Sequence, residues 1–387
     1  MISKEHKKHA AIARPAMGSF GRNEWSIVGS HCTVIKLLAD DIIRYLSPVY
    51  RCAYADTSHN DDITLLPGRL AGGASLEYTD QVNYRQFNYT RELSPFDLRQ
   101  QFAEADIVLV NGNHQLAKAQ VVIVDENKRA SLQKRVKQLT NVELILLSES
   151  TTEVFDFLLE GIPGIAAVPV CRMDDAEAIQ NFFREKLQQA KPKLNGLVLA
   201  GGKSVRMGYD KGTVHWHGRE QRYHLAELLK PFCDEVFISC RSVQKDEIKS
   251  EYATLEDTFV DLGPTGAILS AFREQPDSAW LVVATDLPLL DKDTLAYLVR
   301  HRNAASIATA FNSAVDDFPE PLITIWEPKS YPVLLAYLAQ GYSCPRKVLI
   351  NSDVILLNTP DPNTLTNVNT PEELERVKRI VQQKDSY

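Results

Sequence analysis

The chain reads Leu199-Ala200-Gly201-Gly202-Lys203-Ser204-Val205-Arg206-Met207-Gly208-Tyr209-Asp210-Lys211 directly after the run Gly196-Leu197-Val198. Such an apolar run predicts a buried strand, which ends where the paired glycines begin. Glycines let the backbone turn tightly and approach a ligand closely, while Arg206 and Lys211 bring two cations to the same loop. A glycine pair by itself is more often a plain strand-to-helix turn, but the complete string predicts a loop that binds a triphosphate.

The glycine loop opens the second of two predicted domains. Before it, residues 176–190 carry apolar side chains at helical spacing, and Lys191-Pro192-Lys193 ends that helix before the next strand starts. A chain of 387 residues is long enough for two or three domains. We therefore predict one domain over residues 1–190 and another over residues 191–387.

Composition and charge narrow the classes of function. Hydrophobic residues make up 44% of the chain and charged residues 24%, which is typical of a folded protein. The net charge of −7 leaves no basic surplus for nucleic acid or anionic membranes, and no stretch reaches the roughly 18 apolar residues of a membrane span. The six cysteines form no C-x-x-C pair, which argues against a zinc cluster. The N-terminus lacks an apolar signal region, so we expect a cytoplasmic protein with no nucleic-acid or membrane partner.

Strand-like and helix-like segments alternate from Trp25 onward, the pattern of parallel α/β architecture. In the first domain, strands are predicted within residues 50–56, 105–113, 119–127 and 142–150. Several of them end in polar residues, at the edge where open α/β sheets bind ligands, although polar residues also begin ordinary loops. We expect two three-layer α/β domains.

The first domain begins with a strand, a glycine turn and a helix, the layout of a phosphate-binding unit. A phosphate-binding loop of the Walker A type needs a lysine before its serine or threonine, because that lysine neutralises the phosphates. Here Gly29 is followed by Ser30, His31, Cys32 and Thr33, with no lysine. We therefore expect a degenerate phosphate-binding loop.

The thirteen-residue string of the second domain resembles the L-A-G-G-x-S-x-R-M-G-x-D-K signature of the molybdenum cofactor guanylyltransferases (MobA-like), and it agrees at every fixed position. Related sugar-phosphate and cytidylyl transferases more often have L-A-A-G, so Gly201 favours the guanylyl branch. The resemblance extends over residues 194 to 377. It implies a Rossmann-like nucleotidyltransferase fold and the transfer of GMP from GTP to the molybdenum-pterin cofactor, with release of pyrophosphate.

Two aspartates follow predicted strands in the order that this family shows. Asp257 ends a short strand, and Gly263-Pro264-Thr265-Gly266 then opens a helix with free backbone amides. Asp286 follows an apolar strand, and a hard oxygen ligand at that position suits Mg²⁺. The alternative for Asp286 is a helix N-cap at the start of residues 291–302.

Near the C-terminus, Asn367 and Asn369 are predicted on one face of a strand end, before a helix that starts at Thr370-Pro371. The family has the same N-x-N-T-P-E-E segment. The resemblance implies catalytic roles for Arg206, Lys211 and Asp286, with Mg²⁺ held by Asp286. It implies nucleotide and cofactor contacts at Leu199, Ala200, Gly201, Gly202, Lys203, Lys211, Asp257, Asp286, Asn367 and Asn369.

The sequence also departs from the family pattern. Ser239, followed by Cys240 and Arg241, stands where the family usually carries an asparagine, and Glu320 stands where it usually has a histidine. The change at Ser239 concerns the expected contacts to the nucleobase. The change at Glu320 concerns the pterin side of the expected site. Arg346 and Lys347 begin a predicted helix, either as contacts for a substrate phosphate or as a solvated face.

The first domain has a weaker resemblance to the molybdopterin-guanine dinucleotide adapter proteins (MobB-like), in the order of its strands and in the segment Leu70–Tyr78. The whole chain then resembles an adapter-like domain fused to a transferase. Substrates implied are GTP and a molybdopterin-type cofactor, with molybdoenzyme apoproteins as a further class of partner. The alternatives are a nucleotidyltransferase that uses CTP or a sugar-phosphate acceptor, and a non-catalytic regulatory homologue.

Overall fold

The computed structural model describes residues 11–58, 66, 68–202, 211–313, 316, 318–368 and 370–384. The chain forms two compact units. The first unit is Met17–Ala190, and the second is Lys191–Tyr387 together with the stretch that ends at Ala16. The division falls at the Lys191-Pro192-Lys193 segment, directly after the helix at residues 176–189.

The first unit contains a sheet of parallel strands in the order β2-β5-β1-β6-β7-β8. The strands are β1 (Glu24–Val28), β2 (Cys52–Ala55), β5 (Ile107–Asn111), β6 (Ala119–Val124), β7 (Val142–Leu147) and β8 (Val170–Arg172). The helices are α1 (Cys32–Leu46), α2 (Pro95–Gln101), α3 (Arg129–Lys134), α4 (Asp156–Gly161) and α5 (Ala176–Gln189). All four strands predicted between residues 50 and 150 are confirmed, each somewhat shorter than expected. A separate antiparallel ribbon, β3 (Leu76–Asp80) and β4 (Arg85–Tyr89), was not expected.

Helices cover both faces of this first sheet. Helices α1 and α5 pack on one face, where Ile35 and Phe183 are fully buried against strand residues such as Ile123. Helices α3 and α4 pack on the other face through Leu132 and Leu158. Successive strand residues alternate between these two cores, as the two-residue period of a strand requires. The first unit is therefore a three-layer α/β fold, as predicted.

The second unit contains a mixed sheet in the order β11-β10-β9-β12-β14-β13-β15. The strands are β9 (Leu194–Leu199), β10 (Val236–Cys240), β11 (Ala253–Glu256), β12 (Ala279–Ala284), β13 (Ala308–Asn312), β14 (Pro319–Trp326) and β15 (Val354–Leu357). The helices are α6 (Gln221–Leu229), α7 (Pro264–Glu274), α8 (Lys292–Arg300), α9 (Ser330–Ala339), α10 (Pro345–Ile350) and α11 (Pro371–Lys384). Strands β9 to β12 are mutually parallel, whereas β14 runs antiparallel to both of its neighbours.

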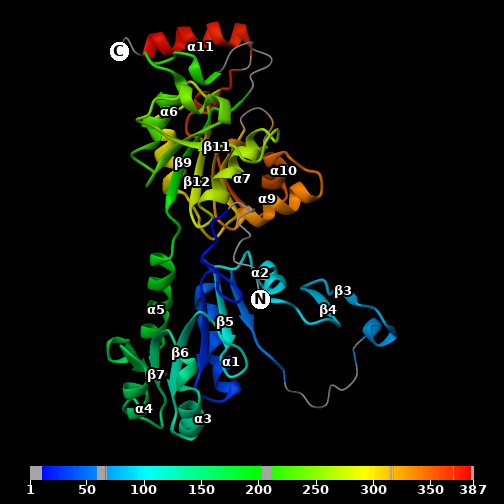
Figure 1. Ribbon diagram of the computed structural model, residues 1–387, viewed down its shortest axis with the longest axis vertical. Coiled ribbons are helices and arrows are strands. Elements are labelled where there is room, and N and C mark those ends of the chain that lie inside the picture. The colour runs from blue at the N-terminus through cyan, green and yellow to red at the C-terminus, as the bar shows by residue number, and fades with distance from the viewer. Residues whose placement is uncertain are drawn as a thin grey trace, which may run out of the picture. The chain divides into compact units, whose positions relative to one another are not determined.

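Helices again cover both faces of the sheet. Figure 1 shows α7, α9 and α10 grouped together on one face, where they share a core with Trp280 and Trp326. Helices α6 and α8 pack on the opposite face through Leu229 and Leu298. The predicted three-layer α/β class is thus confirmed for the second unit as well. Within the described ranges, no helix combines the length and the apolar character needed to cross a membrane.

Candidate functional site

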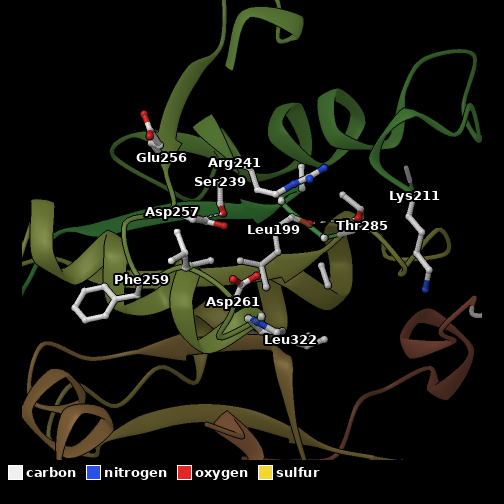
Figure 2. Close-up of a pocket in the computed structure, with 18 of the residues that line it drawn as sticks. Leu199, Lys211, Ser239, Arg241, Glu256, Asp257, Phe259, Asp261, Thr285 and Leu322 are labelled. Atoms are coloured by element: carbon white, nitrogen blue, oxygen red, sulfur yellow. Dashed lines mark hydrogen bonds between the residues drawn. The ribbon is translucent and has the colours of Figure 1, made fainter. Parts of the chain in front are cut away.

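A cavity of about 890 Å³ opens at the carboxyl ends of the four parallel strands of the second unit. The turns after β9, β10, β11 and β12 line it, which is the edge where open α/β sheets place their ligands. Figure 2 shows polar side chains from these separate turns around the same space. The site is therefore assembled from segments that lie far apart in the sequence.

The glycine turn after β9 forms the floor of the cavity. Its entry is fixed because the Ala200 amide donates a hydrogen bond to the Ser239 carbonyl over 3.1 Å. A Cβ atom on Gly201 would lie 2.6 Å from Oδ2 of Asp257, a separation that real Cβ atoms do not show. Gly202 borders open space. Position 201 therefore needs glycine, because any side chain there would collide with the Asp257 carboxylate. At both glycines the backbone itself, without a covering side chain, borders the cavity.

Asp286 lies beyond the tip of β12, beside Lys211. The Lys211 Nζ atom is 3.7 Å from Oδ2 of Asp286. The other carboxylate oxygen, Oδ1, is fully buried and has no hydrogen-bond partner among the described residues. Burial raises the pKa of Asp286, while the charge of Lys211 lowers it and that of Glu320 raises it. A buried, unsatisfied carboxylate oxygen is costly for the fold, so this atom is a candidate position for a bound ligand.

The alternative role for Asp286, as a helix N-cap, is wrong. The cap of α8 is Asp291, whose side chain accepts a hydrogen bond from the Thr294 amide over 2.9 Å. The Asp286 carbonyl instead accepts a hydrogen bond from the Val368 amide over 3.0 Å. This bond joins the β12 tip to the segment that precedes α11.

Asp257 follows β11 and closes the other end of the cavity. Its Oδ1 atom accepts a hydrogen bond of 2.6 Å from the Ser239 hydroxyl, and its amide donates to the Cys240 carbonyl. Burial raises the pKa of Asp257, whereas the bond from Ser239 and the charge of Arg241 lower it and the charge of Glu256 raises it. Ser239, a departure from the family pattern, is thus the direct partner of a predicted site residue.

The structure brings most of the predicted site residues together. Leu199, Ala200, Gly201, Gly202, Lys211, Asp257 and Asp286 all line the cavity. Lys203, Arg206 and Asn369 lie outside the described residues. Asn367 is not among the lining residues, and it is not on a strand end as expected. It lies in the irregular stretch between the short 3₁₀ helix Pro362–Leu365 and α11, because Val368 bonds to the Asp286 carbonyl rather than to a neighbouring strand.

Sequence reasoning missed the loop walls of the cavity. Val243 follows β10 and Val260 follows β11; both line the cavity and are largely exposed. Next to them, Asp261 adopts a left-handed backbone conformation with φ of 60°, which is rare for a residue other than glycine. The only hint in the sequence was their position just after predicted strands. Apolar side chains in loops carry no signature of their own.

Glu320 and Arg346 form an ion pair near the β12 tip. Arg346 reaches Glu320 over 3.2 Å and Asp316 over 3.0 Å. The antiparallel register of β12 and β14 pairs Val283 with Ile323, and its continuation sets Glu320 opposite Asp286. Arg346 is therefore engaged by two carboxylates, and neither it nor Lys347 is among the residues that line the cavity.

In the first unit, the turn between β1 and α1 is shorter than a phosphate-binding loop. Only Gly29, Ser30 and His31 separate the two elements. The Ser30 hydroxyl donates to Asp125 over 2.8 Å, and a Cβ on Gly29 would meet the Ile123 carbonyl at 2.2 Å. The turn thus lacks the length to wrap a phosphate, in addition to the missing lysine.

The second unit is similar in sequence to a known family of proteins. Residues 196–354 match the model of the MobA-like NTP transferase domain. The molybdenum cofactor guanylyltransferase of Pseudomonas fluorescens is 32% identical over 193 residues, which are 47% of this chain and 92% of that protein. A molybdenum cofactor biosynthesis bifunctional protein of Synechocystis is 31% identical over 193 residues. That match spans 50% of this chain and only 56% of the relative.

Two solved structures resemble one part of the chain each. Molybdopterin-guanine dinucleotide biosynthesis protein A from Archaeoglobus fulgidus is 23% identical, with a TM-score of 0.43, and the match covers 49% of this chain and 99% of that one. A MobB protein homolog from Bacillus stearothermophilus is 20% identical, with a TM-score of 0.31, and the match covers 43% of this chain and 99% of that one.

Proposed function

Because the chain belongs to the family of molybdenum cofactor guanylyltransferases, we propose that its second unit transfers GMP from GTP to a molybdopterin-type cofactor. An oxygen of the acceptor's terminal phosphate attacks the α-phosphorus of GTP. The bond from that phosphorus to the bridging oxygen breaks, and pyrophosphate leaves. The observation that supports this proposal most is a single cavity lined by the Gly201-Gly202 turn, Lys211, Asp257 and Asp286.

The residues of this chain act by position and charge. Lys211 lies at the β12 end of the cavity, where its ammonium group offsets the charge that develops on the leaving phosphates. The backbone N–H groups of the glycine turn add partial positive charge next to the same phosphates. The attacking phosphate oxygen is already anionic, so the reaction needs no general base. Arg206, which lies outside the described residues, is proposed to add a second cation to the same phosphates.

Asp286 is proposed to hold Mg²⁺. Its buried Oδ1 atom lacks a partner among the described residues, and carboxylate oxygens are the ligands that this ion prefers. The ion, when bound, neutralises charge on the phosphates. Lys211 holds the other oxygen of the carboxylate at ion-pair distance. No cluster of three or more metal-ligating side chains exists among the described residues, so Asp286 would be a single protein ligand and the phosphates would supply others.

We also propose roles for the residues around Asp286 and Lys211, and for the first unit. Leu199, Ala200 and Asp257 contact the nucleoside, and Asn367 and Asn369 contact the acceptor. The first unit acts as an adapter-like domain that does not hydrolyse GTP, and molybdoenzyme apoproteins receive the product. The reaction takes place in the cytoplasm, which agrees with six free cysteines in the described part of the chain.

The test compares Asp286→Ala with the matched control Asp293→Ala on the exposed first turn of α8. With GTP, Mg²⁺ and molybdopterin cofactor, we expect turnover to fall at least 100-fold for Asp286→Ala, because one preorganised charge contact is worth about that much. Turnover should be unchanged for Asp293→Ala. Undiminished turnover of Asp286→Ala would refute the metal assignment.

The choice of nucleotide is tested separately by thermal unfolding of the wild-type protein. A ligand that binds only the native state raises the unfolding temperature. We expect GTP with Mg²⁺ to stabilise the protein more than CTP, ATP or UTP. A larger shift with CTP would assign the chain a cytidylyl donor instead, and no shift with any nucleotide would favour the non-catalytic alternative.

A further inference from the structure

Ser239 is a fully buried hydroxyl with one side-chain partner. It occupies the fourth position of β10, where its backbone carbonyl accepts the Ala200 amide. Its Oγ atom donates to Oδ1 of Asp257 over 2.6 Å, a short distance typical of a bond to a charged acceptor. The serine therefore fixes the rotation of the Asp257 carboxylate.

The rotation matters because it aims the second carboxylate oxygen. Oδ2 of Asp257 lies 2.6 Å from the point that a Cβ on Gly201 would occupy, directly over the glycine turn. Figure 2 shows the Asp257 side chain hydrogen-bonded to Ser239. With Oδ1 taken by Ser239, Oδ2 is the oxygen that lies next to the glycine turn. A ligand on the glycine turn meets this oxygen first.

Asp257 is too far along the sheet to share the cation of Asp286. The two aspartates follow β11 and β12, with β10 and β9 between them. Three strand spacings amount to about 14 Å. Lys211 lies at the Asp286 end, whereas Asp257 lies at the opposite end, in the part of the cavity that Val243 and Val260 line.

We propose that Ser239 is a positioning residue that orients Asp257 to accept a hydrogen bond from a ribose hydroxyl of the donor nucleotide. The inference rests on the proposed function, and it assigns the sugar-recognition part of that site. An ionised carboxylate is an acceptor only, so it repels phosphates and needs a donor group. On a nucleotide whose phosphates lie beside Lys211, the ribose hydroxyls are the first hydrogen-bond donors met along the cavity toward Asp257.

The experiment measures the dissociation constants of GTP, 2′-deoxy-GTP and 3′-deoxy-GTP by calorimetry with the full-length protein. The variants are Ser239→Ala, Ser239→Cys and Asp257→Asn, and the control is Ser278→Ala, a buried serine whose hydroxyl bonds to Gln275. In the wild type, we expect one of the deoxy nucleotides to bind about tenfold more weakly than GTP. Ser239→Ala should weaken GTP about fivefold and largely remove this discrimination, with an intermediate effect for Ser239→Cys, whose thiol is a weak donor.

Coupling between the two residues separates positioning from a general packing defect. In the Asp257→Asn background, the further change Ser239→Ala should leave GTP affinity and discrimination unaltered, because the carboxylate it orients is gone. Ser278→Ala should keep the full ribose discrimination. An equal loss for all three nucleotides in Ser239→Ala, or unchanged discrimination, would overturn the positioning role while leaving the proposed function intact. A wild-type protein that binds none of the three would overturn both.

Discussion

Gly201 is the residue at which the fold and the site constrain each other most closely. A methyl group there would meet Oδ2 of Asp257 at 2.6 Å, and the bond from Ser239 to the same carboxylate resists its displacement. We expect Gly201→Ala to weaken GTP binding about tenfold, since overpacking of this kind costs about 1–3 kcal/mol. Calorimetric titration with GTP measures it. Gly72→Ala, where a Cβ meets nothing within 4 Å, should bind GTP as the wild type does.

The raised pKa of Asp257 predicts an acid limit for nucleotide binding. Burial raises this pKa, and the Glu256 charge adds to it, while the Ser239 bond and the Arg241 charge oppose it. The ionised carboxylate is the stronger acceptor, and protonation turns one of its oxygens into a donor, so affinity for GTP is complete above this pKa and falls as the pH drops through it. The loss therefore begins at a higher pH than an ordinary aspartate would give.

Ser239→Ala sharpens this pH test. Removal of the hydroxyl removes an interaction that lowers the pKa of Asp257, so the part of the GTP affinity that still depends on this carboxylate should be lost at a higher pH than in the wild type. Titration of GTP affinity between pH 4 and 8 without metal, expressed as the ratio of variant to wild type, cancels the protonation of the nucleotide itself. A ratio that stays constant across this range would show that Asp257 does not bind GTP in its ionised form.

The positions of the lining residues could be predicted from the sequence where the end of a strand is also a motif position. Asp257 and Asp286 followed predicted strands and matched the family string, and both line the cavity. The sequence pattern predicts Asn367 on a strand end, but its neighbour Val368 donates a hydrogen bond to the Asp286 carbonyl instead. Such a long-range backbone bond leaves no trace in local periodicity. The pairing of Ser239 with Asp257 was equally invisible, because it depends on which strands become neighbours.

At the scale of elements, the direction of β14 could have been inferred. The residues between β13 and β14 are only 313–318, too few for the crossover that joins parallel strands. β13 and β14 therefore pair antiparallel. Because β14 also runs antiparallel to β12, the continuation of that second register sets Glu320 opposite Asp286. Apolar periodicity predicts that a strand exists, whereas the length of the connection decides its direction.

The short β1–α1 turn of the first unit predicts that restoring the missing lysine does not create GTP hydrolysis. Cys32→Lys restores the lysine before Thr33, yet Gly29, Ser30 and His31 remain the only residues between the strand and the helix. A phosphate-binding loop must wrap the phosphates with successive backbone amides, and this turn is too short to do so. We therefore expect no gain of GTP hydrolysis, measured as phosphate release by Cys32→Lys in the Asp286→Ala background. Release above the Asp286→Ala level would show that the missing lysine alone explains the loss.

At the scale of the whole chain, each unit has its own cores. Every hydrophobic cluster formed by the described residues lies within one unit: Phe183 and Leu158 belong to cores of the first, and Leu229 and Trp280 to cores of the second. Each unit also has its own sheet. A domain with a complete core can fold alone, and all the lining residues of the cavity come from the second unit.

The fragment 191–387 should therefore fold and bind GTP with the affinity of the full chain. It loses the bond from the Ala16 amide to the Asp277 carboxylate, which is exposed and contributes little to stability. Circular dichroism on heating and GTP calorimetry measure the two properties, and the fragment 17–190 serves as the control that should fold without binding GTP. A folded fragment 191–387 with much weaker GTP binding would mean that the first unit completes the nucleotide site. An unfolded fragment would mean that the second unit depends on residues before Lys191 for its stability.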